Sequence, residues 1–123
     1  MTEIDINKLI LAPTSGDPLV AMRRAELAGW TREAAIASAR ADDLELTPAH
    51  FAVIELLQKI YIEKGRAPHA RYLATLLYDT FAAEGGSRYL YQLFPAGPVA
   101  QGSRLAGTPA PHDTKDLSFG STY

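Results

Sequence analysis

The pattern that most constrains the fold is a run of two capped, amphipathic helical segments between residues 47 and 85. Thr47 is a favourable N-cap residue, and Pro48 suits the first helical position, where its missing N–H has no intrahelical partner in any case. Gly65 is the expected C-terminal stop. Apolar residues recur between them at spacings of three and four, the period of one helix face. These residues are Phe51, Ile54, Leu57 and Tyr61, widened by Val53, Leu56 and Ile60.

A second helix is predicted directly after this stop, opened by Pro68 and ended by Gly85-Gly86. The inward side chains are predicted to be Tyr72, Leu73, Leu76, Leu77 and Phe81. Two amphipathic helices joined by a tight link are typical of a helix-turn-helix-like pair.

The remaining chain predicts further short helices, each marked by a cap or a stop. They run from residue 19 to 27 behind Asp17-Pro18, from an N-cap at Thr31 through an alanine-rich segment, from an N-cap at Ser87 to Phe94, and from Val99 to Ala106 before Gly107. Residues 4–10 alternate between apolar and polar, so the sequence leaves open a short strand and a small N-terminal β-hairpin. The prediction is a mainly α fold, a small orthogonal helical bundle.

Length and charge narrow the class of protein. A chain of 123 residues suits one domain with its own core. We expect a single domain over residues 1–111, irregular or short-stranded over 1–16, with a flexible tail over 112–123. The net charge of −2 gives no general attraction to nucleic acid or to an anionic membrane. No basic leader or long apolar run is present, so we expect no membrane partner and a cytoplasmic location.

No metal or cofactor site is expected. The three histidines, His50, His69 and His112, lie far apart and lack ligand spacing, so we interpret them as two solvated helix-start residues and a tail residue. Ser103 lacks the strand-turn-helix setting of a nucleophilic serine and is interpreted as a surface or packing hydroxyl. Because the chain contains no cysteine, disulfides and thiolate metal sites are excluded.

Several ordered motifs resemble one known family. The segment Leu46-Thr47-Pro48-Ala49-His50-Phe51 is similar to an LTPEHW-type helix entry, and Gly86 to Pro95 is similar to a GNSKYLYELFP block. Other matching positions are Trp30, Ala37, Ala67-Pro68, Arg71-Tyr72-Leu73, Gly97-Pro98, Gln101, Ala106-Gly107 and Pro109. Over residues 30–111 the chain resembles the DsrC/TusE family of bacterial sulfur-relay proteins, which carry persulfide on cysteine.

The resemblance implies two cysteine positions that this chain does not fill. The upstream position falls on Ser103 and the terminal one near Thr114, and the chain continues beyond the family's usual end. An engineered Cys→Ser change would explain Ser103 alone, so a natural cysteine-free paralogue is favoured. Because a thiolate is the nucleophile of persulfide chemistry, we expect no catalytic residue, and the chain is not expected to be an enzyme.

Partner binding is the function that the resemblance leaves. Arg71 and Arg88 match basic positions of the family motifs, and with Tyr91 and Arg104 they are the candidate partner-binding residues. The resemblance implies partners of the DsrEFH/TusBCD sulfurtransferase type or a dissimilatory sulfite reductase, to which the chain would relate as a gamma-subunit-like regulatory protein. The plainer interpretation, a solvated basic face with packed tyrosines, stays open.

Two alternatives belong to other classes. The helix-turn-helix-like pair suggests a DNA-binding regulator, although its second helix is poor in Arg, Lys, Asn and Gln. A sulfur carrier in sulfur relay or tRNA 2-thiolation is the assignment that family membership alone suggests, and the missing thiols argue against it.

Overall fold

The computed structural model describes residues 17–112, and within this range the chain forms six α-helices, one short 3₁₀ helix and no strand. The elements are α2 (Pro18–Glu26), α3 (Arg32–Arg40), α4 (Pro48–Lys64), α5 (Ala70–Thr80), η1 (Ala82–Glu84), α6 (Gly86–Leu93) and α7 (Pro98–Ala106). The mainly α prediction is confirmed. The strand expected over residues 4–10 lies outside the described residues, as does the tail expected over 112–123 except for His112, so the proposed limits of a single domain stay a prediction.

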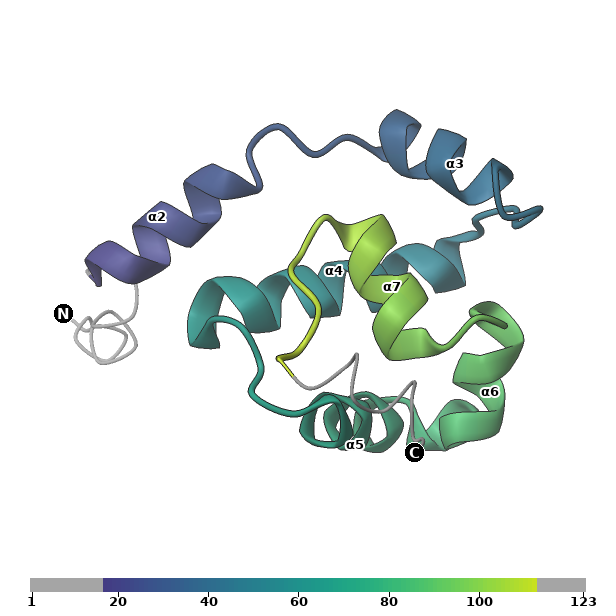
Figure 1. Ribbon diagram of the computed structural model, residues 1–123. Coiled ribbons are helices and arrows are strands. Elements are labelled where there is room, and N and C mark those ends of the chain that lie inside the picture. Colours follow the sequence, from purple (N-terminus) through teal and green to yellow (C-terminus); the bar gives the residue numbers. More distant parts are fainter. Residues whose placement is uncertain (1–16, 113–123) are drawn as a thin grey trace, which may run out of the picture.

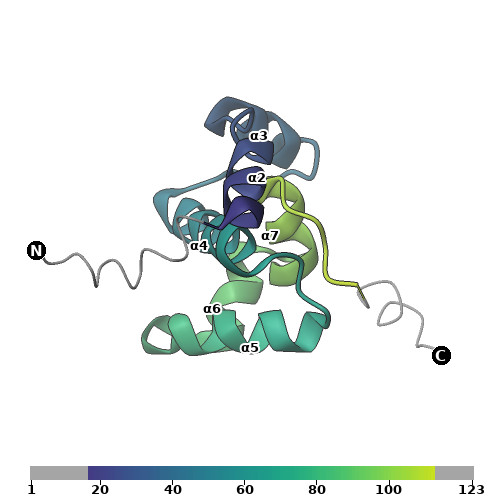
Figure 2. The ribbon, with the colours of Figure 1, turned by 90° about the vertical axis from the view of Figure 1, so that its left-hand side faces the viewer.

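The long helix α4 is the centre of the bundle (Figure 1). Helix α7 packs across it, and α2 packs against its C-terminal half at one end of the molecule. Helices α5 and α6 form a lower layer that also contacts α7. Figure 2 shows α5 lengthwise where Figure 1 shows it nearly end-on, whereas α4 lies lengthwise in Figure 1, so the two helices cross. The orthogonal arrangement predicted from the sequence is therefore confirmed.

Residues of α3, α4, α5, α6 and α7 together form one hydrophobic core. Within α4 the predicted stripe is confirmed for Phe51, Ile54 and Leu57, which are buried. Tyr61, the fourth predicted member, is only half-buried and donates a hydrogen bond to the Glu26 carboxylate of α2 instead. Leu90 and Phe94 insert into the same core from α6 and its end. The fully buried core members include Val53, Ile54, Leu77, Leu90, Phe94, Leu105 and Ala106.

Several predicted caps form as expected. The Asp17 carboxylate accepts a hydrogen bond from the Leu19 N–H at 2.8 Å, and the Thr31 hydroxyl accepts one from the Ala34 N–H at 3.1 Å. These bonds satisfy N–H groups that an α-helix leaves without partners at its start. Gly107 ends α7 in the left-handed region with φ of 77°, where glycine avoids the strain of a side chain.

Two predicted helix starts were wrong. The helix expected from Pro68 begins at Ala70, because His69 is extended (φ −136°, ψ 136°) and is the N-cap residue. Ser87 was expected to cap α6 but lies inside it, since the chain turns one step earlier, at Gly85 (φ 135°) and Gly86 (φ 62°). Both glycines take positive φ values that other residues rarely adopt.

Two side chains lie in environments opposite to those predicted. Tyr72, expected to point inward, is 45% exposed, because the buried face of α5 follows Ala70, Leu73 and Leu77. His50, expected to be solvated, is only 5% exposed, because its ring extends from α4 to the end of α6. Its burial is possible because both ring nitrogens have partners.

Candidate functional site

Ser103, at the position that the family resemblance assigns to a cysteine, is buried in α7 and only 1% exposed. Its hydroxyl oxygen has no hydrogen-bond partner among the described residues. A buried hydroxyl without a partner is unusual, because its transfer from water is then uncompensated. A thiol is a weaker donor and acceptor and fits such a site at lower cost. The environment of Ser103 therefore suits a small, weakly polar side chain, and within residues 17–112 no base accepts a hydrogen bond from its hydroxyl.

Two side-chain hydrogen bonds hold the C-terminal end of α7, directly after Ser103. The indole Nε1 of Trp30 donates a hydrogen bond of 2.8 Å to the carbonyl oxygen of Leu105. The side-chain amide of Gln58, from α4, donates one of 2.9 Å to the carbonyl oxygen of Ala106. Both bonds satisfy carbonyl groups that a helix leaves free at its C-terminal end. Ser103 is thus fixed in the core.

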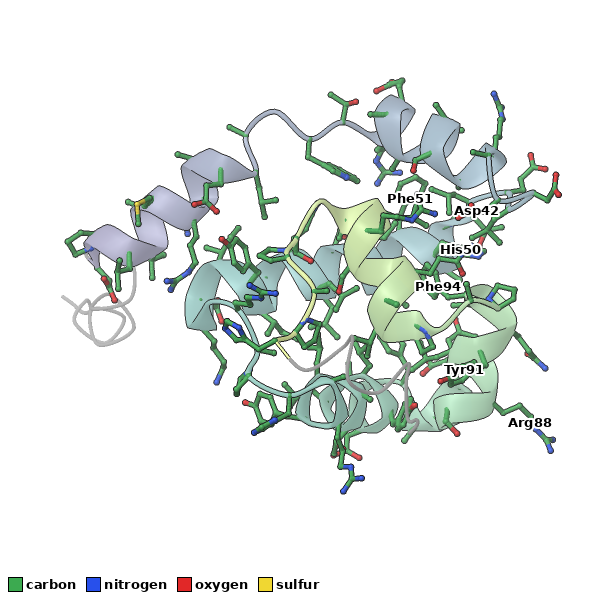
Figure 3. All side chains as sticks on the ribbon, in the orientation of Figure 1. Asp42, His50, Phe51, Arg88, Tyr91 and Phe94 are labelled. Carbon is green, nitrogen blue, oxygen red and sulfur yellow. The ribbon has the colours of Figure 1, made fainter. Side chains whose placement is uncertain are left out.

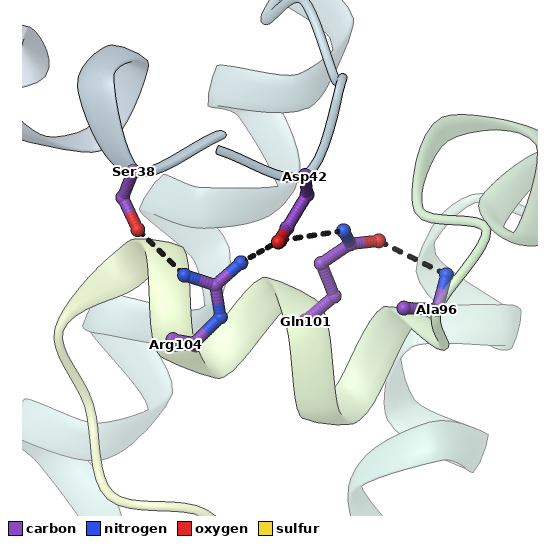
Figure 4. Close-up of polar contacts among 5 residues, drawn as sticks. All are labelled: Ser38, Asp42, Ala96, Gln101 and Arg104. Atoms are coloured by element: carbon purple, nitrogen blue, oxygen red, sulfur yellow. Dashed lines mark hydrogen bonds and ion pairs between the residues drawn. The ribbon is translucent and has the colours of Figure 1, made fainter. Parts of the chain in front are cut away.

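Arg104 belongs to a polar network that joins α7 to the end of α3 (Figure 4). Its guanidinium forms an ion pair with Asp42, and its Nη1 donates a 2.5 Å hydrogen bond to the hydroxyl of Ser38. The Asp42 carboxylate also accepts a bond of 3.3 Å from the amide of Gln101, whose oxygen accepts one of 3.1 Å from the Ala96 N–H. Arg104, predicted to bind a partner, is therefore occupied within the bundle.

Arg71 and Tyr91 line one groove, with a volume of about 540 Å³, between α5, α6 and the start of α7. Helix α5 presents small residues there, Ala70 and Ala74, so the groove lies where larger side chains would otherwise fill the space. The remaining lining residues are Thr75, Tyr78, Ala96, Gly97, Pro98, Val99 and Ala100. An apolar floor with a cation and phenols at its edges is typical of a surface that binds a peptide or a small organic group.

The two phenols of this groove interact with each other. Burial raises the pKa of Tyr78 above its usual value, and the hydrogen-bonded hydroxyl of Tyr91 raises it further. Tyr91 itself is 50% exposed, whereas Tyr89 of the same helix is half-buried against the core. Tyr91 is thus the tyrosine of this block that offers an exposed aromatic face.

The four predicted partner-binding residues therefore separate into three places. Arg71 and Tyr91 both line the groove, Arg104 lies in the network with Asp42, and Arg88 points away from the bundle at the outer edge of α6 (Figure 3). Sequence reasoning missed Tyr78. Its spacing of four from Ala74, which itself follows Ala70 by four, indicates one face of α5 with two small residues and an aromatic one.

The described residues also bear on the other classes of site. Among residues 17–112 no group of three His, Cys, Asp or Glu side chains could hold a metal ion. None of the helices in this range is long and apolar enough to cross a membrane. The exposed face of α5 carries Arg71, Tyr72, Thr75 and Asp79, so it offers one cation and one carboxylate to DNA. This face does not favour the DNA-binding alternative.

Comparison with known proteins decides the family. The family model described as "DsrC like protein" matches residues 24–114. This chain belongs to the DsrC family. It is 37% identical over 87 residues to a protein of Salmonella paratyphi A named sulfurtransferase TusE, an alignment that covers 70% of this chain and 80% of that relative. The protein of the same name from Escherichia coli K12 is 36% identical over 87 residues, with the same coverage.

A solved structure supports the same fold. The NMR structure of DsrC from Allochromatium vinosum matches this chain with a TM-score of 0.58 and 40% sequence identity. The match covers 67% of this chain and 74% of the A. vinosum protein. The resemblance stated from the motifs is confirmed by these findings. The present chain nevertheless contains no cysteine at any of its 123 positions.

Proposed function

We propose that this DsrC-family chain is a non-catalytic, partner-binding protein of sulfur metabolism with a regulatory role. The observation that carries the proposal is the complete absence of cysteine from a chain whose relatives are named sulfurtransferases. Persulfide transfer proceeds by attack of a thiolate on sulfur, and the hydroxyl of Ser or Thr does not replace it. The chain therefore retains the scaffold of the family without the atom that would carry sulfur.

The setting of Ser103 supports this proposal. The side chain is 1% exposed, and the helix that bears it is tied to Trp30 and Gln58. A residue in this position is not accessible to a donor protein while α7 stays in place. Ser103 is accordingly assigned a packing role, and no residue is assigned a catalytic one.

The groove between α5, α6 and α7 is the proposed partner site. Arg and Tyr, with Trp, are the side chains that most often dominate binding energy at protein interfaces, and Arg71 and Tyr91 both line this groove. The proposed partners, by family membership, are a cytoplasmic sulfurtransferase complex of the DsrEFH/TusBCD type or a sulfite reductase. Arg88, which points away from the bundle at the outer edge of α6, and Arg104, which pairs with Asp42, do not line this groove.

Binding is tested by calorimetry of the full chain against these two kinds of complex. We expect saturable binding that Arg71→Glu and Tyr91→Ala each weaken at least tenfold, which corresponds to about 1.4 kcal/mol. Arg24→Glu on α2 is the matched charge reversal away from the groove, and Tyr72→Ala removes an exposed tyrosine of α5 that does not line the groove. Both controls should bind like the wild type. The proposal would be contradicted if the chain bound neither kind of complex.

The lack of sulfur transfer is tested separately by intact-mass measurement after incubation with a persulfide donor. The wild-type chain should gain no sulfur atom. A Thr114→Cys variant, which places a thiol at the family's terminal position, should gain one and shows that the assay works. A stable sulfur adduct on the wild-type chain would refute a non-catalytic role even if partner binding is found.

A further inference from the structure

The described chain ends beside the groove that Arg71 and Tyr91 line. Arg66 Nε donates a hydrogen bond of 2.6 Å to the carbonyl oxygen of Ala110, and the His112 N–H donates one of 3.1 Å to the carbonyl oxygen of Ala67. Pro111, between them, is fully buried. Because Ala67 precedes the groove residue Ala70 by three positions, the chain passes residue 112 at the N-terminal end of α5.

The following residues, 113–123, complement the groove in composition. They read DTKDLSFGSTY, so two carboxylates precede two large apolar side chains, Leu117 and Phe119. The groove offers small apolar residues on its floor and the Arg71 guanidinium at its edge. Arg71 forms no ion pair within residues 17–112. In the sequence after residue 112, the acidic side chains that can pair with Arg71 are those of Asp113 and Asp116.

Length does not prevent this segment from reaching the whole groove. Helix α5 has 11 residues and is about 16 Å long at 1.5 Å per residue. Eleven extended residues span up to roughly 36 Å. Leu117 lies five residues beyond His112, so it reaches the middle of α5 without full extension, and Phe119 follows two residues later.

We propose that residues 113–123 dock in the groove between α5, α6 and α7, with Leu117 and Phe119 over Ala74 and Val99 and with Asp116 beside Arg71. The docked segment covers Arg71 and Tyr91, so it competes with any partner that uses the same residues. Docking itself does not depend on the proposed partner. Burial of these two apolar side chains and the new ion pair favour it.

The absence of cysteine allows a direct test on the full chain. In Ser121→Cys the new thiol is the only one and takes a single nitroxide spin label. We expect the label to broaden the backbone amide NMR signals of Thr75, Tyr78 and Ala100 strongly. The amides of Arg24 and Ala34, on α2 and α3, should keep their line widths. Reduction of the nitroxide should restore the broadened signals and gives the reference spectrum.

Substitutions on each side identify the contact. Leu117→Ser combined with Phe119→Ser should reduce the broadening several-fold, whereas Thr114→Ala in the same segment should not. On the groove side, Ala100→Glu places a bulky carboxylate at an exposed lining position and should have the same effect. Ala52→Glu, at an exposed position of α4, is the matched control and should leave the broadening unchanged.

Three results would overturn the inference. The first is broadening that is absent or equal on α2, α3 and the groove. The second is broadening that survives the double substitution at Leu117 and Phe119. The third is broadening that persists when a spin-labelled chain without ¹⁵N is mixed with a ¹⁵N chain without the label, because the occupant is then a second copy. Each leaves the calorimetric test of partner binding untouched, so the two proposals can fail separately.

Discussion

His50 joins the start of α4 to the end of α6 through a hydrogen bond of 2.7 Å between its Nε2 and the carbonyl oxygen of Leu93. The other ring nitrogen, Nδ1, accepts a bond of 3.0 Å from the Thr47 N–H. Because the Leu93 oxygen can only accept, the proton of the neutral ring lies on Nε2. The ring also meets Phe94 edge-on, with centroids 5.2 Å apart. One side chain thus caps a helix and links two layers of the core.

The first prediction concerns this link. His50→Ala should lower the free energy of unfolding by about 3 kcal/mol, because it leaves the Leu93 carbonyl without its partner and opens a cavity beside Phe94. Urea denaturation measures the loss. His112→Ala, at an exposed histidine, should change the stability by less than about 0.5 kcal/mol. A similarly small effect at His50 would contradict the assigned role.

The fold could be predicted from the sequence to a large extent, because helix caps and apolar periodicity are local signals. Asp17, Thr31, Thr47 and Gly107 each mark a helix end that the structure confirms. The errors arise where a tertiary contact or backbone geometry decides. The burial of His50 depends on Leu93, which lies 43 residues away and is absent from any local pattern.

The candidate site could be predicted only in part, for a similar reason. Arg71 and Tyr91 come from different helices, and they line one groove because of how α5 packs against α6. Arg104 resembles them in the sequence, yet Asp42, which lies 62 residues earlier, pairs with it. Residue type and motif position indicate which side chains are candidates, but the pairing of charges depends on the tertiary structure.

The second prediction is that Ser103→Ala does not destabilise the protein. The substitution removes a buried hydroxyl that has no partner among the described residues, so the free energy of unfolding should stay the same or rise by up to about 1 kcal/mol. Ser38→Ala is the control. It makes the same change within a helix, with the same gain in helix propensity, but it removes a hydroxyl that accepts a hydrogen bond from Arg104. Ser103→Ala should be the more stable variant. A loss of more than about 1 kcal/mol would mean that the hydroxyl has a hydrogen-bond partner.

The third prediction concerns reactivity at the same position. A Ser103→Cys variant should fold, because the thiol is only modestly larger than the hydroxyl and, as a weak donor and acceptor, suits a buried position without a hydrogen-bond partner among the described residues. Its reaction with a thiol reagent should be slower in the native than in the unfolded chain by roughly tenfold for each 1.4 kcal/mol of opening free energy. Stopped-flow absorbance, recorded without urea and in denaturing urea, measures the ratio of the two reaction rates. Equal rates would show that α7 does not protect this position.

The fourth prediction tests the close contact between α7 and α4. A Cβ atom at Gly102 would lie 2.9 Å from the Cδ1 atom of Leu57, a side chain that is 2% exposed. Alanine is favoured over glycine in a helix by about 1 kcal/mol, but overpacking against a buried side chain costs about 1–3 kcal/mol. We therefore expect Gly102→Ala to lower stability by about 1 kcal/mol. Gly29→Ala, with no atom within 4 Å of the new Cβ, should be neutral. Urea denaturation of both variants measures the difference.

The last prediction concerns alkaline pH. Burial raises the folded-state pKa of Tyr78 above the value of 10.0 that applies to the unfolded chain. Its contribution to stability is therefore complete below about pH 10 and is lost as the pH rises through the folded-state pKa, because unfolding then releases a proton. Between about pH 8 and pH 11 the free energy of unfolding should fall more for the wild type than for Tyr78→Phe, whereas Tyr72→Phe should follow the wild type. Parallel curves for the wild type and Tyr78→Phe would show that Tyr78 ionises with the same pKa in both states.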